Sequence, residues 1–261
     1  MTAAAGIFTR DMMHDDDYST AFFSESERFF HNRMNGVLAQ YNGKRDSYVE
    51  FVCDWEGMYS TLSREKFRIL LAGRHYLDTF YYGFNYSMFH YAGQQGAPIE
   101  NVVDLQLLTP CVGVRFNAFF DFDIKLGALL TAQRDRSFGH SWEKPCMGEF
   151  AFRISRWGLS LDERLYVGDN IHPFFYGHEL EDGTPLPYGR ELYPAESFFR
   201  TDQKVYSRTA LSYRRSFFDD TVSVRAEFAA HHDGTALGTQ QMLVVGVKLL
   251  KTVYNSKNHK K

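Results

Sequence analysis

Cysteine and proline are both scarce in this sequence. It has seven prolines and three cysteines, and an odd number of cysteines cannot all pair within one chain. Cys53, Cys111 and Cys146 also lack the CxxC spacing of a zinc site or a thioredoxin-like motif. We therefore expect the cysteines to be small apolar residues within or beside strands.

The chain also lacks a long hydrophobic run and a signal peptide. Without a run of about 18 apolar residues there is no candidate transmembrane helix, although a membrane barrel leaves no such signal. The N-terminus, MTAAAGIFTRDMMHDDDYST, has neither a basic region nor a sufficient apolar region for secretion. Read literally it predicts a cytoplasmic protein, but a mature chain with an added Met, or the later part of a longer chain, fits equally well.

Signatures of catalysis and of nucleic-acid binding are missing too. The sequence contains no GxSxG, no P-loop and no dinucleotide fingerprint. A net charge of -3 and a pI near 6.4 argue against a nucleic-acid partner. We therefore expect neither an enzyme nor a cofactor.

Aromatic residues and period-two segments are abundant. Aromatics make up 16% of the chain, and apolar residues alternate with polar ones in most segments, as in DTVSVRAEFAA after Phe218. The alternation predicts eleven strands. They are Met34–Tyr41, Ser47–Trp55, Lys66–Tyr76, Phe80–Tyr91, Val102–Arg115, Asp121–Gln133, Met147–Trp157, Leu159–Val167, Lys204–Arg214, Thr221–Ala230 and Gln240–Lys251.

The lengths of strands and connections favour a membrane barrel over a soluble sandwich. Many of the predicted strands have nine to twelve residues, where a tilted membrane strand needs about nine to eleven and a globular strand about five or six. Short and long connections alternate through all ten. An up-and-down antiparallel transmembrane β-barrel has this pattern, with short turns on the periplasmic side and long loops outside. A Greek-key sandwich need not have it.

The expected organisation is one β-barrel domain over residues 34–251, followed by a polar tail over 252–261. Residues 1–33 are an N-terminal extension or a partial first strand. Bacterial single-chain barrels usually have an even strand count, so eleven strands suggest a twelfth. The stretch AAGIFTRD is a poor candidate for it.

Several phrases resemble a group of poorly characterised outer-membrane barrel proteins of the Bacteroidetes. They are YVEFVCDWEGMYSTLSREKFRILLAGRHYL, FYYGFNYSMFHYAG, LYVGDN and YRRSFFDDTVSVRAEF. The resemblance covers roughly residues 29–251. It implies an outer-membrane location and a porin-like or surface role, and it carries over no catalytic residue. Members of that group tend to have additional N-terminal sequence, from which this chain departs.

If the apolar faces of the strands meet lipid, the charged faces line a lumen. The acidic pair Asp121 and Asp123 could approach the spacing of a glycosidase, but a mixed-charge wall explains the whole set without catalysis. The lumen-lining candidates are Glu50, Asp54, Arg68, Arg74, Asp104, Asp121, Asp123, Lys125, Glu149, Arg153, Asp162, Arg164, Arg208, Arg225 and Glu227.

Two loop clusters raise the question of a metal site. They are His172, His178 and Glu179, and the run from His231 through His232 to Asp233. Adjacent histidines on an extended segment point apart, so we expect solvated loop residues and no metal.

The connection of residues 168–203 is rich in aromatics, and loops of this length are usually functional or disordered. It is expected to form a constriction in the lumen or an external surface on which a sugar ring stacks, unless it is a packed cap without ligand. Its binding candidates are Phe174, Phe175, Tyr176, Tyr188 and Tyr193.

These features predict a porin-like outer-membrane protein that passes or gates small polar solutes. Its partners would be outer-membrane lipid and a small polar solute or glycan. A soluble all-β binding or structural protein is the first alternative, and an outer-membrane barrel enzyme is the second.

Overall fold

The chain forms one large antiparallel sheet in which every strand pairs with its neighbours in sequence. The computed structural model describes residues 1–96, 102–136, 141–171, 195–200 and 203–247. Its twelve strands follow the order β1 to β12 across the sheet. They are β1 (Thr2–Thr9), β2 (Arg33–Asn42), β3 (Tyr48–Gly57), β4 (Lys66–Leu77), β5 (Phe80–Tyr91), β6 (Val103–Asn117), β7 (Asp121–Asp135), β8 (Cys146–Arg156), β9 (Leu159–Gly168), β10 (Val205–Phe217), β11 (Val222–His232) and β12 (Leu237–Val247).

The sheet confirms the all-β, up-and-down antiparallel prediction and adds the twelfth strand. Eleven strands overlap the predicted segments, and β1 overlaps the stretch AAGIFTRD over residues 4–9. The alanines and glycine of β1 carry little of the β-branched and aromatic character that marks a strand, but Thr2 to Thr9 pair in register with Gln40 to Arg33. Residues 1–33 thus contain a complete strand of the sheet.

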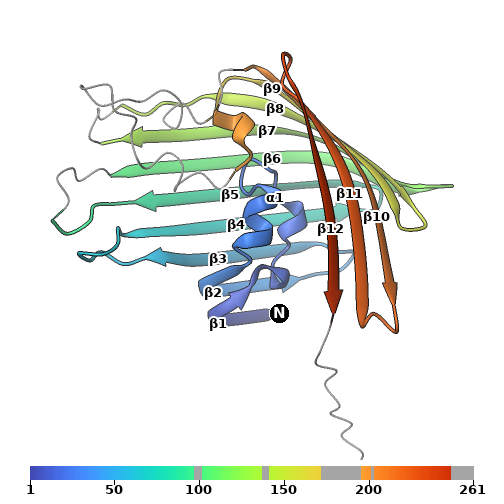
Figure 1. Cartoon of the computed structure of the whole chain (residues 1–261), viewed down its shortest axis with the longest axis horizontal. Helices are drawn as coiled ribbons and strands as arrows, with labels where there is room; N and C mark the ends of the chain where they lie inside the picture. The colour runs from blue at the N-terminus through green and yellow to red at the C-terminus, as the bar shows by residue number, and fades with distance from the viewer. Residues whose placement is uncertain (97–101, 137–140, 172–194, 201–202, 248–261) are drawn as a thin grey trace, which may run out of the picture.

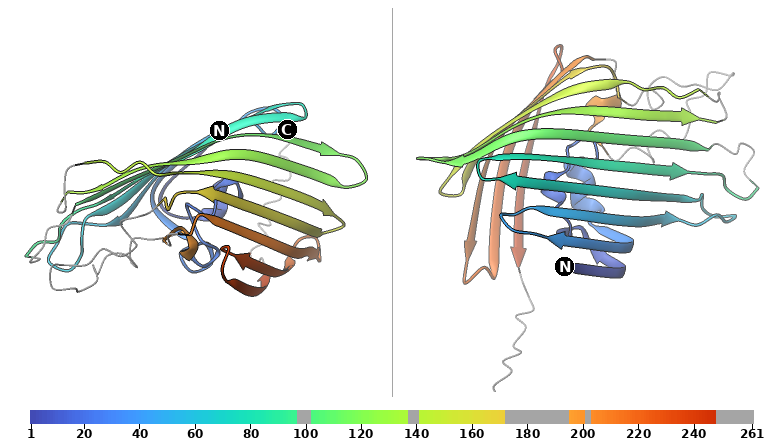
Figure 2. Two further views of the ribbon diagram at one scale, coloured as in Figure 1. Left: turned by 90° about the horizontal axis from the view of Figure 1, so that it is seen from above. Right: turned by 180° about the vertical axis from the view of Figure 1, so that it is seen from behind.

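The sheet curls strongly, so that β10, β11 and β12 swing across in front of the first strands (Figure 1). A right-handed twist accumulated over many strands bends a sheet in this way. β1 and β12 are its two edges, and within the described residues no ladder of hydrogen bonds joins them. The curl gives the sheet a concave and a convex face (Figure 2).

Tight hairpins connect the strands at one end of the sheet. Trp157 and Gly158, both with positive φ, form the two-residue connection of β8 and β9, and this backbone geometry matches the twist of the paired strands. The connections after β2, β4, β6 and β10 lie at the same end and are also short. The long connections all lie at the other end, as predicted. The connection between β11 and β12 also lies there, but it spans only residues 233–236, so the predicted alternation of short and long connections fails at this last hairpin.

The first long connection folds back onto the concave face. This inner segment (residues 10–32) joins β1 to β2 and contains the short helices η1 (Arg10–Met12), η2 (Asp15–Asp17) and α1 (Glu25–Phe30). Ser24 caps α1 by accepting a hydrogen bond of 3.0 Å from the amide of Glu27. Figure 1 shows the segment inside the curl, beside the short helix η5 (Ser197–Arg200). Within the described residues no helix is both long enough and apolar enough to cross a membrane.

The inner segment supplies the centre of the main hydrophobic core. Tyr18, Phe22 and Phe23 are buried there. They share a cluster with inward-facing side chains from most strands of the sheet, among them Met34, Leu38, Tyr48, Val52, Leu70, Ala72, Leu107, Leu129, Met147, Tyr166 and Tyr206. The concave face is thus partly apolar, and its apolar part is covered by the chain itself.

Candidate functional site

The concave face collects almost all of the charged residues that the alternation assigns to a lumen. On β3, for example, Tyr48, Glu50, Val52 and Asp54 are buried against the inner segment, while Val49 between them is 57% exposed on the convex face. The same alternation places on the concave face Arg68 and Arg74 of β4, Asp121, Asp123 and Lys125 of β7, Glu149 and Arg153 of β8, Asp162 and Arg164 of β9, Arg208 of β10, and Arg225 and Glu227 of β11.

Asp104 is the exception, because it lies on the convex face. Its neighbours Val103 and Leu105 point inward and pack with Phe89 and Tyr91 in a small apolar cluster. At this end of β6 the apolar side chains therefore belong to the inner face, which reverses the assignment from alternation alone. The side chain of Asp104 instead pairs with those of Arg134, at 2.8 Å, and Arg136, at 2.9 Å, and with His90.

Glu50 is the first of three polar anchors for the inner segment. Its carboxylate accepts hydrogen bonds from the amide of His14 at 2.9 Å, the hydroxyl of Tyr18 at 3.0 Å and the side-chain amide of Gln40 at 2.5 Å. Burial, and then the negative charge of Glu50, raise the pKa of Tyr18 well above its usual value. Tyr18 is therefore a neutral hydrogen-bond donor to a buried carboxylate.

The second anchor joins the inner segment to the opposite part of the sheet. The hydroxyl of Tyr166 on β9 lies 3.0 Å from that of Ser19 and 3.3 Å from that of Thr20, and it donates to Glu149 on β8 at 3.1 Å. Glu149 also pairs with Lys125 of β7 at 3.1 Å. These buried groups satisfy one another, as a polar network in a low-dielectric interior must.

Arg10 forms an internal clasp of the inner segment. Its guanidinium lies 3.9 Å from the centre of the Phe23 ring, and its Nε donates to the carbonyl of His31 at 2.8 Å. Asp15 and Glu27 lie 3.8 and 3.6 Å from its terminal nitrogens. The pKa of Arg10 is lowered, and burial of the guanidinium is the largest cause of the shift. The clasp holds the two ends of the inner segment together.

Ion pairs with the sheet form the third set of anchors. Arg74 on β4 pairs with Asp17 at 2.9 Å, and Arg208 on β10 lies 3.9 Å from Glu25. Arg208 also pairs with Glu227 on β11 at 2.5 Å, and Arg225 contacts the other oxygen of Glu227 at 2.6 Å. The inner segment is thus fixed at separate points around the curled wall.

The described end of the long connection between β9 and β10 packs on the same face. Phe198 and Phe199 of η5 are buried, and Phe198 stacks on Tyr206 with ring centroids 4.2 Å apart. The amide of Glu196 donates to the carbonyl of Thr20 at 3.1 Å, and its carboxylate accepts from the amide of Glu25 at 3.1 Å. The five binding candidates of this connection, Phe174, Phe175, Tyr176, Tyr188 and Tyr193, lie outside the described residues.

The described members of the candidate metal and catalytic clusters are engaged in hydrogen bonds within the protein. The imidazole of His231 bonds to the hydroxyl of Tyr206, and that of His232 accepts from the amide of Gly234. The carboxylate of Asp233 caps its own turn, and hydrogen bonds from the amides of Ala236 and Thr235 lower its pKa. No metal-binding group of three or more ligands occurs in the described part of the chain, and His172, His178 and Glu179 fall outside it. Of the acidic pair, Asp121 accepts from Asn117 and Asp123 from Tyr81.

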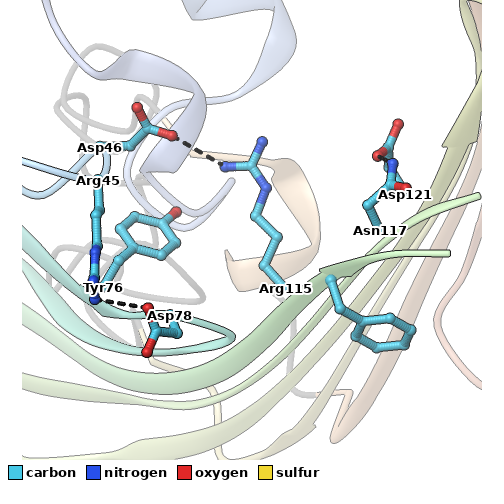
Figure 3. A pocket seen from close by; sticks show the side chains of 8 residues that line it. Arg45, Asp46, Tyr76, Asp78, Arg115, Asn117 and Asp121 are labelled. Carbon is cyan, nitrogen blue, oxygen red and sulfur yellow. Dashed lines mark hydrogen bonds and ion pairs between the residues drawn. The ribbon is translucent and has the colours of Figure 1, made fainter.

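A shallow pocket of about 420 Å³ lies at the rim with the short turns (Figure 3). Both of its arginines face carboxylates, since Arg45 pairs with Asp78 at 2.7 Å and Arg115 lies 4.0 Å from Asp46. These are exposed pairs, which contribute little stability. The third carboxylate of the lining, that of Asp121, accepts a hydrogen bond from the neutral side chain of Asn117. The lining residues are Arg45, Asp46, Tyr76, Asp78, Arg115, Phe116, Asn117 and Asp121.

The cysteines match the expectation of residues within or beside strands. All three are free, with Cys111 buried and Cys146 exposed. Cys53 lies on β3, Cys111 on β6 and Cys146 at the start of β8.

Comparison with known proteins places the chain in no group: no family model, no curated protein and no solved structure matches it. The resemblance to Bacteroidetes outer-membrane proteins therefore stays a prediction.

Proposed function

We propose that this protein is an outer-membrane β-barrel that passes small polar solutes and that the inner segment gates its lumen. The observation that carries the proposal is the contrast between the two faces of the sheet. The concave face bears buried charges and hydrogen-bond networks, whereas the convex face bears large exposed apolar side chains. In the proposed barrel β1 and β12, which run antiparallel, would meet to close the sheet.

A single row across the convex face illustrates its apolar character. Tyr82, Val112, Leu126 and Phe150 are aligned on four consecutive strands by the hydrogen-bond register. Their exposed fractions are 53, 57, 58 and 36%. Soluble monomers rarely expose contiguous apolar patches larger than a few hundred Å². Contact with lipid would remove the unfavourable exposure of these apolar side chains to water.

Aromatic side chains gather where the short turns meet the convex face. Phe119, Trp157 and Phe218, on three different hairpins, are 63, 73 and 79% exposed. The guanidinium of Arg156 lies 3.5 Å from the centre of the Phe119 ring and 4.3 Å from that of Trp157. Aromatic girdles with a nearby cation are typical of the membrane–water interface of barrels, where the rings lie at headgroup level.

The inner segment is the gating element of the proposal. It covers the apolar centre of the concave face and is anchored to β3, β4, β9 and β10 by the bonds described above. Both ends of the inner segment continue into strands, β1 and β2. The segment would therefore open the pore by rearranging inside the lumen.

Membrane insertion is tested first. The protein should remain in washed outer membranes, need detergent for purification and migrate differently on a gel before and after heating. Purification as a monodisperse protein in plain buffer at high concentration would refute the barrel.

Gating is tested with Glu50→Gln in planar lipid bilayers. The substitution weakens two hydrogen bonds to the inner segment, from His14 and Tyr18, and one to Gln40 of β2. The variant should therefore be open for a larger fraction of time than the wild type. Glu65→Gln is the matched control, because the hydrogen bonds of Glu65 in the β3–β4 connection are made by its backbone. A membrane-inserted protein in which neither the wild type nor Glu50→Gln conducts would refute the passage of solutes.

A further inference from the structure

We infer that the solutes of the proposed pore are anions and that they follow a ladder of arginines on strands β8 to β11. The inference rests on the proposed function and names its class of solute. Five arginines face the concave side of these four strands: Arg153, Arg164, Arg208, Arg214 and Arg225.

The register places like charges directly opposite each other. Arg164 of β9 is the cross-strand partner of Arg208 of β10, and Arg214 of β10 is the partner of Arg225 of β11. Like charges in directly opposed positions destabilise a sheet. Two such pairs on one wall are a cost to folding that a passing or bound anion would offset.

The carboxylates on this wall offset only part of the positive charge. Glu227 serves both Arg208 and Arg225, and Asp162 pairs with Arg153 at 2.5 Å. Glu149 of β8 and Glu25 of the inner segment lie near Arg164, but Glu149 also serves Lys125 and Glu25 also serves Arg208. No ion pair of Arg214 occurs among the residues that the structure describes.

Deeper in the wall, guanidinium groups keep unused donors. Nη1 of Arg164 and Nε of Arg208 are shielded from solvent and make no hydrogen bond to any residue that the structure describes. A buried donor without an acceptor destabilises the protein, and an anionic oxygen would supply the missing acceptor.

Between the two arginine pairs the wall carries small hydroxyl side chains. Ser155, Ser160 and Ser212 are aligned across β8, β9 and β10. Hydroxyls donate to anions, and their small size leaves room beside the guanidinium groups. Arg208 and Arg214 are six residues apart on β10, so the ladder spans roughly 20 Å along the strand.

The ladder also reaches beyond the inner segment. At its inner end Arg208 approaches Glu25 of that segment, whereas Arg225 is 31% exposed near the short turns. An anion entering from the short-turn end would therefore meet Arg214 and Arg225 first and Arg208 at the gate.

The test is the reversal potential of bilayers across a potassium chloride gradient, measured in the Glu50→Gln background. Chloride should permeate faster than potassium. Arg214→Gln combined with Arg225→Gln should lower the chloride-to-potassium permeability ratio by about sevenfold. A change of one kT in the local potential changes the partition of each ion by about 2.7-fold, and in opposite directions for the two ions.

Arg215→Gln is the control, since Arg215 adjoins Arg214 on β10 but points to the convex face, where it lies over the Phe217 ring. It should leave the ratio unchanged. A pore that conducts but prefers potassium, or whose ratio is the same with and without Arg214 and Arg225, would overturn the arginine ladder and leave the pore itself standing. The absence of any conductance would overturn the proposed function instead.

Discussion

Leu126→Arg separates a lipid-facing sheet from a water-facing one. Leu126 lies on β7, is 58% exposed and sits between Val112 and Phe150 in the convex row. If that row faces lipid, an arginine there should lower the free energy of unfolding by about 2–4 kcal/mol near the bilayer midplane. This corresponds to roughly 30- to 900-fold in the unfolding equilibrium. On a water-facing surface the same change is worth within about 0.5 kcal/mol, because the long side chain meets only solvent.

The assay is reversible guanidinium unfolding in lipid vesicles, followed by the fluorescence of the three tryptophans. Leu62→Arg provides the matched control, since Leu62 is 92% exposed in the connection between β3 and β4 and should tolerate the charge. Equal stabilities of the two variants and the wild type would refute the assignment of the convex face to lipid.

Three further outcomes are expected. Since the pKa of Tyr18 is raised in the folded protein, the stability that its neutral hydroxyl contributes is fully present below about pH 10, the usual tyrosine value, and falls as the pH rises beyond it. The inner segment should accordingly become susceptible to protease at alkaline pH, and resistance that persists unchanged would contradict this reasoning. Tyr18→Phe should lower the free energy of unfolding in vesicles by about 1.5–3 kcal/mol, because the carboxylate of Glu50 loses a hydrogen-bond donor. A variant as stable as the wild type would show that this anchor is dispensable. A water-soluble maleimide should label the exposed Cys146 in the folded protein and the buried Cys111 only after unfolding, as peptide mass spectrometry can determine; labelling of both at equal rates would contradict the packing of β6.

The sheet was predictable because its strands are long and alternate over many residues. On β11, Val224 and Phe228 take one face and Arg225 and Glu227 the other, and from Ala226 to Ala229 the burial of the strand alternates in the same way. β1 was harder to identify, since the run Ala3–Ala5 has no polar partner to alternate with. Its pairing with β2 specifies it as a strand, and this tertiary contact has no local signature.

The inner segment could not be predicted, because the contacts that define it join distant parts of the chain. Tyr18, Ser19 and Phe23 lie in a stretch with no period of two, and their partners are on β3 and β9. For the same reason the concave face carries more apolar side chains than the sequence suggested. Leu70 and Leu129 point inward because they pack on this segment. A dense run of acids followed by aromatics, from Asp15 to Phe30, was the signal available.

The meander topology has a consequence for the order of assembly. Every strand pairs with the next one along the chain, so the sheet can grow by successive local hairpins without waiting for remote parts of the protein. The hydrogen bond from Ser19 to Tyr166 joins residues 147 positions apart, and the chain between them must be in place before it can form. We therefore expect the protein to pass through a state with an assembled sheet and an unlocked inner segment. In that state water would reach the concave face of the sheet. The docking of the inner segment would exclude this water and would be the last step of folding.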